Sequence, residues 1–200
     1  MNNHLKENRW LLTIPFIAVV LLISLSCSRD STPSPSYSSQ SQTSTYESID
    51  PTGSLQATVT QVVDGDTVKV KFEDNSSDTV RILGIDTPET HVMNKPYEYG
   101  EITNLDCLKA WGTQATEFTF NMLYEREITI ESDPLAPERG YYDRRLAYVR
   151  INEKDFGSLL LEKGLARVYE EGESGRKTEY LQQEAKAKDS VLGLWGCDSN

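Results

Sequence analysis

Two short segments carry charged residues whose types and spacing suit phosphate chemistry. The segment RILGIDTPET places Arg81, Asp86 and Glu89 around an apolar run, and DGDT places Asp66 after a glycine. Carboxylates that a curled sheet brings together at strand ends form a hard oxygen site for Ca²⁺ or Mg²⁺. The planar fork of an arginine fits phosphate oxygens. With a spare carboxylate as a base for water, these groups could hydrolyse a phosphodiester.

Each of these residues also has an ordinary structural interpretation. Asp66 in DGD and Asp86 before Thr-Pro are both typical of turns. Burial of an unpaired guanidinium is costly, so Arg81 either pairs with a fixed carboxylate or points into a cleft toward an anionic ligand. His91 is the only histidine outside the N-terminal segment, and we interpret it as a solvated loop residue. Three cysteines without a paired-histidine pattern argue against a zinc site.

A second basic group surrounds the segment RGYYDRRLAY, where Arg139, Arg144 and Arg145 lie close in sequence. These guanidinium groups could supply further phosphate contacts. The net charge of −11, however, argues against a long-range electrostatic attraction to nucleic acid. A polyanionic substrate would therefore need a local basic site or a bridging cation.

The elements that must position these residues begin with strands. The segment LQATVTQVVDGDTVKVKFED alternates apolar and polar residues after DGD, which predicts a β-hairpin. DTVRILGID predicts a third strand, and the alternation in REITIESD and RRLAYVRI predicts two more. Residues 91–107 have no periodicity and are predicted to form a loop.

Helical segments are interspersed among the later strands. The segment DFGSLLLEKG predicts a short helix with Asp155 as its N-cap and Gly164 as its stop. KTEYLQQEAKAKDSVLG predicts a charged helix that ends at Gly193. An earlier helix is indicated by apolar residues at helical spacing: Trp111, Ala115, Phe118 and Met122. The expected fold class is α+β, with a small, curled antiparallel sheet and helices on one side.

The N-terminal part of the chain predicts export. Lys6 and Arg9 precede an apolar run at residues 10–25, which is typical of a secretory signal and also just long enough for a marginal membrane span. Cys27 follows directly and is a candidate for lipidation. Ordinary cleavage nearby and an uncleaved anchor are the alternatives. Each of them places the folded domain outside the cytoplasm, either secreted or attached to the envelope membrane.

The composition divides the chain into three parts. Residues 1–27 form the export segment. Residues 28–54 are rich in Ser, Thr and Pro and are predicted to be a disordered tether. Residues 55–197 are predicted to form one folded domain.

Five motifs within this domain are collectively specific. VVDGDTVKV, RILGIDTPET, YYDRRLAYV, LLLEKGLARVY and EAKAKDSVLGLW follow one another in that order. Over residues 56–196 the chain resembles the staphylococcal nuclease (thermonuclease) family. The resemblance implies an OB-fold barrel of five strands with three helices. It also implies Ca²⁺-dependent cleavage of DNA and RNA to 3′-phosphate products.

The resemblance assigns the metal-binding and basic roles residue by residue. Asp66 and Asp86 match the two calcium carboxylates, and Thr87 matches the residue that offers a backbone carbonyl to the ion. Glu89 matches the group that acts as general base or orients the water.

The resemblance also assigns substrate contacts. Arg81 and Arg144 match the two arginines that contact phosphate. Tyr142 looks like the tyrosine near the terminal phosphate of the nucleotide. Tyr169 corresponds to a base-stacking tyrosine with a register that is off by one.

The chain departs from the family pattern at several positions. Asp143 stands where a glycine is common and could compete with phosphate for Arg144, while Arg145 could share the phosphate load. The 91–110 loop is long and is expected to border the site. Cys107 and Cys197 are expected to form a disulfide in an exported protein, the alternative being two free thiols.

Three functions remain open on the sequence alone. The first is a secreted or surface-tethered nuclease, expected to be a monomer. The second is a non-catalytic nucleic-acid-binding module on the same barrel. The third is a structural envelope domain that uses Ca²⁺ only for stability.

Overall fold

The computed structural model describes residues 53–197 of the chain. The predicted export segment, Cys27 and nearly all of the predicted tether lie outside the described residues. No helix within 53–197 is both long enough and apolar enough to span a membrane.

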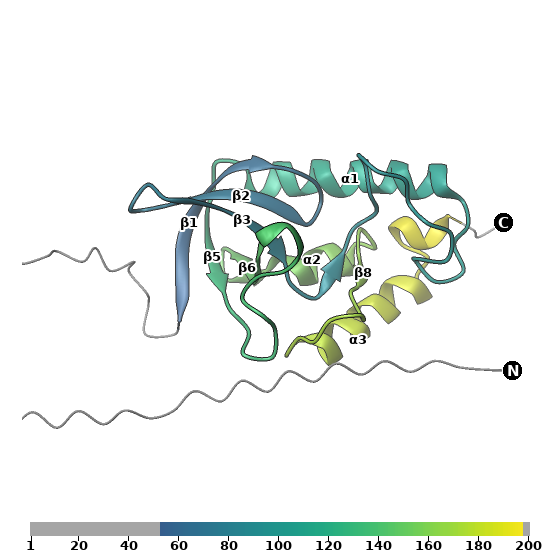
Figure 1. The fold of residues 1–200 in the computed structure, drawn as a ribbon. Helices are drawn as coiled ribbons and strands as arrows, with labels where there is room; N and C mark the ends of the chain where they lie inside the picture. Colours follow the sequence, from purple (N-terminus) through teal and green to yellow (C-terminus); the bar gives the residue numbers. More distant parts are fainter. Residues whose placement is uncertain (1–52, 198–200) are drawn as a thin grey trace, which may run out of the picture. The chain divides into compact units, whose positions relative to one another are not determined.

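Five strands close into a barrel, which is the predicted OB-fold architecture (Figure 1). β1 pairs antiparallel with β2 and with β5, β2 pairs with β3, and β5 pairs with β6. A parallel pairing of β3 with β6 closes the ring. The bounds are β1 Ser54–Val62, β2 Thr67–Phe72, β3 Ser77–Ile82, β5 Glu127–Glu131 and β6 Arg145–Ile151.

The period-2 pattern of the sequence explains the barrel core. Val59, Val68, Val70 and Val80 are fully buried, and the residues between them on β2 and β3 face outward. β1 pairs with β2 in the register Val59↔Val70 and Val62↔Val68, so the predicted hairpin is confirmed. A one-residue slip would turn the valines to solvent, which fixes this register.

Three α-helices accompany the barrel: α1 Leu105–Leu123, α2 Phe156–Glu162 and α3 Lys177–Asp189. Short elements complete the fold: strands β4 Ile85–Asp86, β7 Lys154–Asp155 and β8 Arg167–Val168, and the 3₁₀ turns Tyr141–Asp143 and Gly193–Gly196. In Figure 1, α1 runs along the top of the view, and α3 lies below α1.

The caps of α2 are those that the sequence predicts. The Asp155 side chain accepts a hydrogen bond from Ser158 N over 3.1 Å at the N-terminus. Gly164 ends the helix in a left-handed conformation, with a φ of 64°.

Two predicted helix boundaries were wrong. α1 begins at Leu105, two residues before Cys107, because the Asn104 side chain caps the helix by accepting from Cys107 N. α3 ends at Asp189 and not at Gly193. Val191 adopts a φ of 51°, which breaks the helix before the glycine.

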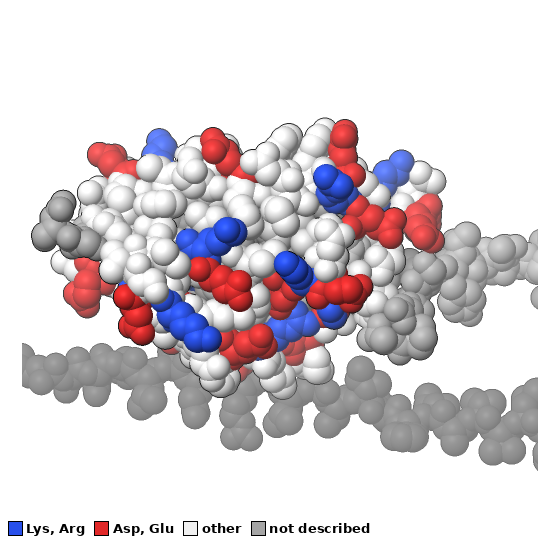
Figure 2. All heavy atoms as spheres, turned by 180° about the vertical axis from the view of Figure 1, so that it is seen from behind, with Lys and Arg blue, Asp and Glu red and all other residues white. Residues whose placement is uncertain are grey.

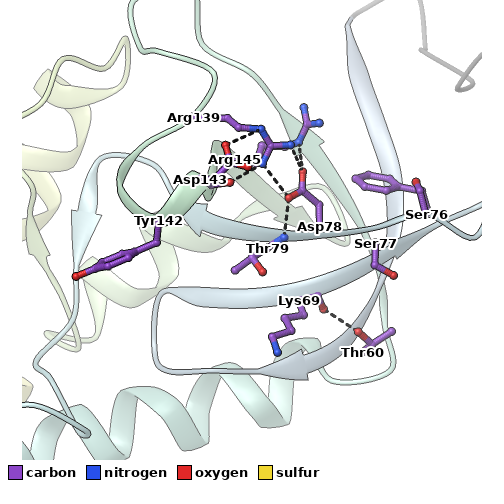
Figure 3. A pocket seen from close by; sticks show the side chains of 11 residues that line it. Thr60, Lys69, Ser76, Ser77, Asp78, Thr79, Arg139, Tyr142, Asp143 and Arg145 are labelled. Atoms are coloured by element: carbon purple, nitrogen blue, oxygen red, sulfur yellow. Dashed lines mark hydrogen bonds and ion pairs between the residues drawn. The ribbon is translucent and has the colours of Figure 1, made fainter.

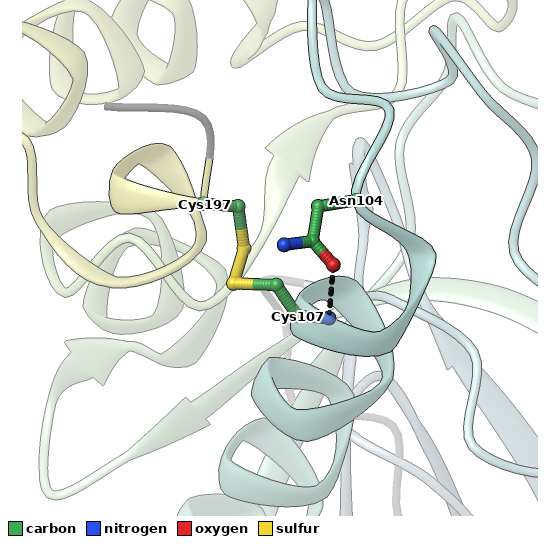
Figure 4. The surroundings of a disulfide bond; sticks show 3 residues. All are labelled: Asn104, Cys107 and Cys197. Atoms are coloured by element: carbon green, nitrogen blue, oxygen red, sulfur yellow. Dashed lines mark hydrogen bonds between the residues drawn. A yellow bond between two sulfur atoms is a disulfide. The ribbon is translucent and has the colours of Figure 1, made fainter. Parts of the chain in front are cut away.

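A satellite core lies beside the barrel core and holds the only disulfide among the described residues. Cys107 and Cys197 are bonded with a Cα–Cα distance of 5.7 Å, which ties the start of α1 to the C-terminal turn (Figure 4). The buried apolar members of this cluster are Tyr99, Ile102, Leu108, Leu194 and Cys197.

Candidate active site

Asp66 lies in the turn before β2, and its carboxylate is held from several sides. Oδ2 accepts hydrogen bonds from the Thr87 backbone N–H over 2.8 Å and from the Thr87 hydroxyl over 3.0 Å. Oδ1 accepts one from the Thr67 hydroxyl over 3.0 Å. The two segments that carry Asp66 and Thr87 are therefore joined at the predicted site.

Arg81 in β3 connects the two predicted metal carboxylates. Its Nη1 lies 2.6 Å from Asp66 Oδ2 and its Nη2 lies 2.7 Å from Asp86 Oδ1. Of the two interpretations that the sequence left open, the structure has the ion pair. Asp66 and Asp86, 20 positions apart in the chain, are thereby brought to within the width of one guanidinium group.

Asp86 has two further partners that the sequence analysis did not identify. Asp86 in β4 is the cross-strand partner of Arg167 in β8, and Arg167 Nε lies 3.1 Å from Asp86 Oδ2. The Tyr99 hydroxyl donates to the same oxygen over 3.2 Å. The only sequence signal for Arg167 was its place in the motif LLLEKGLARVY, and Tyr99 had none.

Tyr169 borders the same site through Arg167. The Arg167 guanidinium lies 5.8 Å from the centroid of the Tyr169 ring and 5.5 Å from that of Tyr99. Tyr169 is half-buried. The structure therefore places it next to the partner of a site carboxylate.

Glu89 has its backbone fixed and its carboxylate free. Asn94, which is buried, accepts from Glu89 N over 2.7 Å and donates to Glu89 O over 3.0 Å. The Glu89 carboxylate makes no hydrogen bond or ion pair with any other described residue. It remains close enough for the charges of Asp66 and Asp86 to act on it. Asn94 was not identified from the sequence.

Arg144 joins the site through Thr67. Its Nη1 lies 3.4 Å from the Thr67 hydroxyl, which in turn bonds Asp66, and its Nε donates to Tyr141 O over 3.1 Å. Arg144 makes no ion pair with a carboxylate in the described part of the chain. Its guanidinium lies 5.6 Å from the centroid of the Tyr142 ring, and Tyr142 is 93% exposed.

The other two arginines of this segment are not part of the site, contrary to expectation. Arg139 and Arg145 both bind the carboxylate of Asp78, over 2.9 Å and 3.0 Å. Asp143 lies 3.6 Å from Arg139 and does not pair with Arg144. Tyr142 and Asp143 both have left-handed backbones, with φ of 61° and 57°. This turn separates neighbours in sequence, so the Arg145 and Asp143 side chains pair with Asp78 and Arg139, and neither pairs with Arg144.

Helix α1 supports both loops that carry the carboxylates. The Thr119 hydroxyl donates to Gly65 O over 2.6 Å, next to Asp66. A Cβ on Gly112 would lie 2.3 Å from Pro88 O, so only glycine lets the helix approach the Thr-Pro-Glu segment this closely. The helix thus fixes the separation of the two loops.

The electrostatics of the site favour an additional positive charge. Burial raises the pKa of Asp66 to about 6, with Arg81 opposing the shift and Asp64 adding to it. Burial also raises the pKa of Asp86 against the effect of Arg81. Burial, together with the charges of Asp66 and Asp86, raises the pKa of Glu89. Carboxyl groups that resist ionisation beside one another are stabilised in their charged form by a cation.

The types of oxygen donor suit a hard cation, although Arg81 lies between the two carboxylates. Among residues 53–197, no three Asp, Glu, His or Cys side chains gather closely enough to hold a metal ion. Two carboxylates and the neighbouring backbone carbonyl of Thr87 are nevertheless the oxygen ligands that Ca²⁺ takes. A cation at this place would compete with Arg81 for oxygens of Asp66 and Asp86.

One face of the domain offers little general attraction for a polyanion. On the face shown in Figure 2, acidic and basic side chains are intermixed, without a continuous basic area.

Comparisons with known proteins identify the family of the chain. The family described as staphylococcal nuclease homologue matches residues 79–197. An uncharacterized protein of Methanocaldococcus jannaschii is 40% identical over 151 residues, which cover 71% of this chain and 72% of that protein. The thermonuclease of Staphylococcus intermedius is 32% identical over 140 residues, which cover 68% and 74%. The SPbeta prophage-derived endonuclease YokF of Bacillus subtilis is 34% identical over 143 residues, which cover 70% of this chain but 44% of YokF.

The chain therefore belongs to the staphylococcal nuclease family. It is a nuclease, a hydrolase that acts on phosphodiester bonds. The resemblance seen in the sequence motifs is confirmed.

Proposed function

We propose that this protein is a Ca²⁺-dependent nuclease that cleaves DNA and RNA to 3′-phosphate products outside the cytoplasm. The observation that carries the proposal is the convergence of Asp66, Arg81, Asp86, Glu89 and Arg144. These residues come from separate parts of the chain and meet around one pair of carboxylates.

The acidic residues divide into ligands and a base. Asp66 and Asp86 with the carbonyl of Thr87 would hold the ion, which when bound supplies neutralisation of phosphate charge and activation of water. Glu89 is the general base, because its carboxylate has no competing partner and its raised pKa makes it a better proton acceptor near neutral pH.

The two arginines of the site also have different roles. Arg81 neutralises the carboxylate pair with both ends of its fork. A cation that takes over these carboxylate oxygens would free the fork for a phosphate. Arg144, unlike Arg81, has no carboxylate partner in the described structure, which leaves it free to bind the charge that develops on the phosphate oxygens.

The disulfide supports a location outside the cytoplasm, because disulfides persist mainly in oxidising compartments. The apolar segment at residues 10–25 and Cys27 support export and lipid attachment at the cell envelope. We propose that the protein works there as a monomer.

The test is digestion of plasmid DNA and of RNA with added Ca²⁺, and then with a chelator, followed by analysis of the product ends. We expect both substrates to be cleaved only with Ca²⁺, with phosphate on the 3′ ends. Oligonucleotide binding without any product would indicate the non-catalytic module instead. A higher melting temperature in Ca²⁺ without any effect of nucleotides would indicate the structural envelope domain.

A further inference from the structure

The β2–β3 hairpin carries a regular series of residue pairs on its outer face. Residues directly opposed across the two strands project on the same side. Thr67 is opposite Arg81, Lys69 is opposite Thr79, and Lys71 is opposite Ser77. Each pair therefore combines one basic residue with one hydroxyl residue. Successive pairs are separated by two residues, or about 7 Å along the strands.

The first of these pairs belongs to the active site. Arg81 bridges Asp66 and Asp86, and Thr67 lies between Asp66 and Arg144. The next two pairs, Lys69–Thr79 and Lys71–Ser77, extend from this point toward the tip of the hairpin. We call these two pairs the hairpin track.

The lysines of the hairpin track have no competing partners. Lys69 and Lys71 are exposed, and neither ammonium group makes an ion pair with a carboxylate in residues 53–197. The nearest acidic residue on β3, Asp78, is neutralised by Arg139 and Arg145. In a protein with a net charge of −11, two unpaired lysines in line with the active site make a local basic path.

A groove follows the first part of this track. It has a volume of about 780 Å³, and its lining includes Lys69, Thr79, Ser77 and Tyr142. Two aspartates and two arginines that pair with one another also line it: Asp78, Asp143, Arg139 and Arg145. Figure 3 shows Tyr142 at one end of the groove and Lys69 on the strand below Thr79. Lys71 lines a neighbouring hollow of about 240 Å³.

Tyr142 connects the groove to the catalytic arginine. Its left-handed backbone, with a φ of 61°, projects a ring that is 93% exposed. The Arg144 guanidinium lies against the same ring. An exposed aromatic ring beside a groove that contains an unpaired lysine is a combination that binds single-stranded nucleic acid, because bases stack on the ring while cations contact the phosphates.

We propose that the hairpin track binds the single-stranded nucleic acid that flanks the scissile phosphodiester, with Lys69 and Lys71 on successive phosphates. This inference rests on the proposed nuclease function and adds to it a binding site for the strand that flanks the cleaved bond. The track ends after two pairs, because Glu73 and Asp74 follow Lys71 at the tip of the hairpin.

Lysine-to-glutamine variants test the track. We expect K69Q/K71Q to bind a fluorescent single-stranded oligonucleotide more weakly, measured by anisotropy in Ca²⁺ in an E89Q background. The logarithm of the association constant falls as the logarithm of the salt concentration rises, and this slope should become shallower by about 0.7 for each lost lysine contact. In the cleaving enzyme, kcat/KM should fall more on a long single strand than on a dinucleotide.

The matched control is K109Q/K154Q, which removes two exposed lysines from α1 and β7. The control has the same change in net charge. The contribution of the hairpin track is therefore the difference in affinity, salt slope and length dependence between the two double variants. Equal binding, equal salt slopes and an equal length dependence in both would overturn the proposal. The wild type could cleave no substrate and still bind the oligonucleotide. If K69Q/K71Q then binds it more weakly and K109Q/K154Q does not, the nuclease function fails and the hairpin track stands.

Discussion

The Tyr99 hydroxyl donates a hydrogen bond to Asp86 Oδ2 over 3.2 Å. Tyr99 is 1% exposed and belongs to the satellite core that the Cys107–Cys197 disulfide closes. The long loop before α1, expected only to border the site, thus positions a predicted metal ligand. The same loop supplies Asn94, which fixes the backbone of Glu89.

Removal of the Tyr99 hydroxyl should weaken cation binding. Partners of a metal-binding carboxylate orient it, and their loss typically costs at least about tenfold in affinity or activity. We expect Tyr99→Phe to lower the Ca²⁺ affinity by about tenfold, measured by titration calorimetry. Tyr97→Phe changes an exposed tyrosine of the same loop and should have no effect. Equal affinities in the two variants would mean that Tyr99 does not position Asp86.

The disulfide should contribute strongly to stability. It joins residues 90 positions apart, and the chain-entropy model gives about 4–5 kcal/mol for a closed loop of that length. We expect the double variant Cys107→Ser/Cys197→Ser to unfold at a much lower urea concentration than the wild type. A reductant should lower the wild-type midpoint and leave that of the double variant unchanged. A wild-type midpoint that is insensitive to reductant would contradict this role.

Cation binding should weaken in acid. The pKa of Asp66 is raised to about 6, so a proton competes with the cation for this carboxylate below that pH. The Ca²⁺ affinity should be constant above pH 7 and fall about tenfold per pH unit below pH 6. The raised pKa values of Asp86 and Glu89 act in the same direction. Calorimetric titrations between pH 5 and 8 with a pH-independent affinity would exclude Asp66 as a ligand.

The close contact of Gly164 with the Leu192 carbonyl should be essential for the fold. Gly164 has a φ of +64°, and a Cβ there would lie 2.2 Å from Leu192 O. Gly100 has a similar φ of +71° but no atom within 4 Å of the added Cβ. Gly100→Ala should therefore cost only the left-handed backbone strain, about 1 kcal/mol. Gly164→Ala should lower the free energy of unfolding, measured in urea, by several times that amount. Equal losses of stability in the two variants would mean that the structure relieves the close contact easily.

The local part of the site was predictable from sequence. Asp66, Arg81, Asp86, Thr87 and Glu89 lie in two short motifs whose strands and turns have strong local signals. Hairpin alternation sets the register Thr67↔Arg81, which brings the first motif next to the second.

The partners of the site required the tertiary structure. Arg167 reaches Asp86 only because β8 pairs with β4, and each of these strands has just two residues. Tyr99 and Asn94 lie in a loop without periodicity. Adjacency in sequence was also misleading for Arg145 and Asp143, because two successive left-handed residues turn them toward Asp78 and Arg139.

The central claim is that Glu89 acts as the base in a site formed with Asp66, Asp86, Arg81 and Arg144. Single-turnover cleavage of single-stranded DNA by Glu89→Gln, with Glu101→Gln in the exposed part of the same loop as the control, tests it most directly. We predict that Glu89→Gln cleaves about 10²–10⁴ times more slowly while it still binds Ca²⁺ and oligonucleotide, and that Glu101→Gln cleaves at the wild-type rate. A wild-type rate in Glu89→Gln would contradict the assignment.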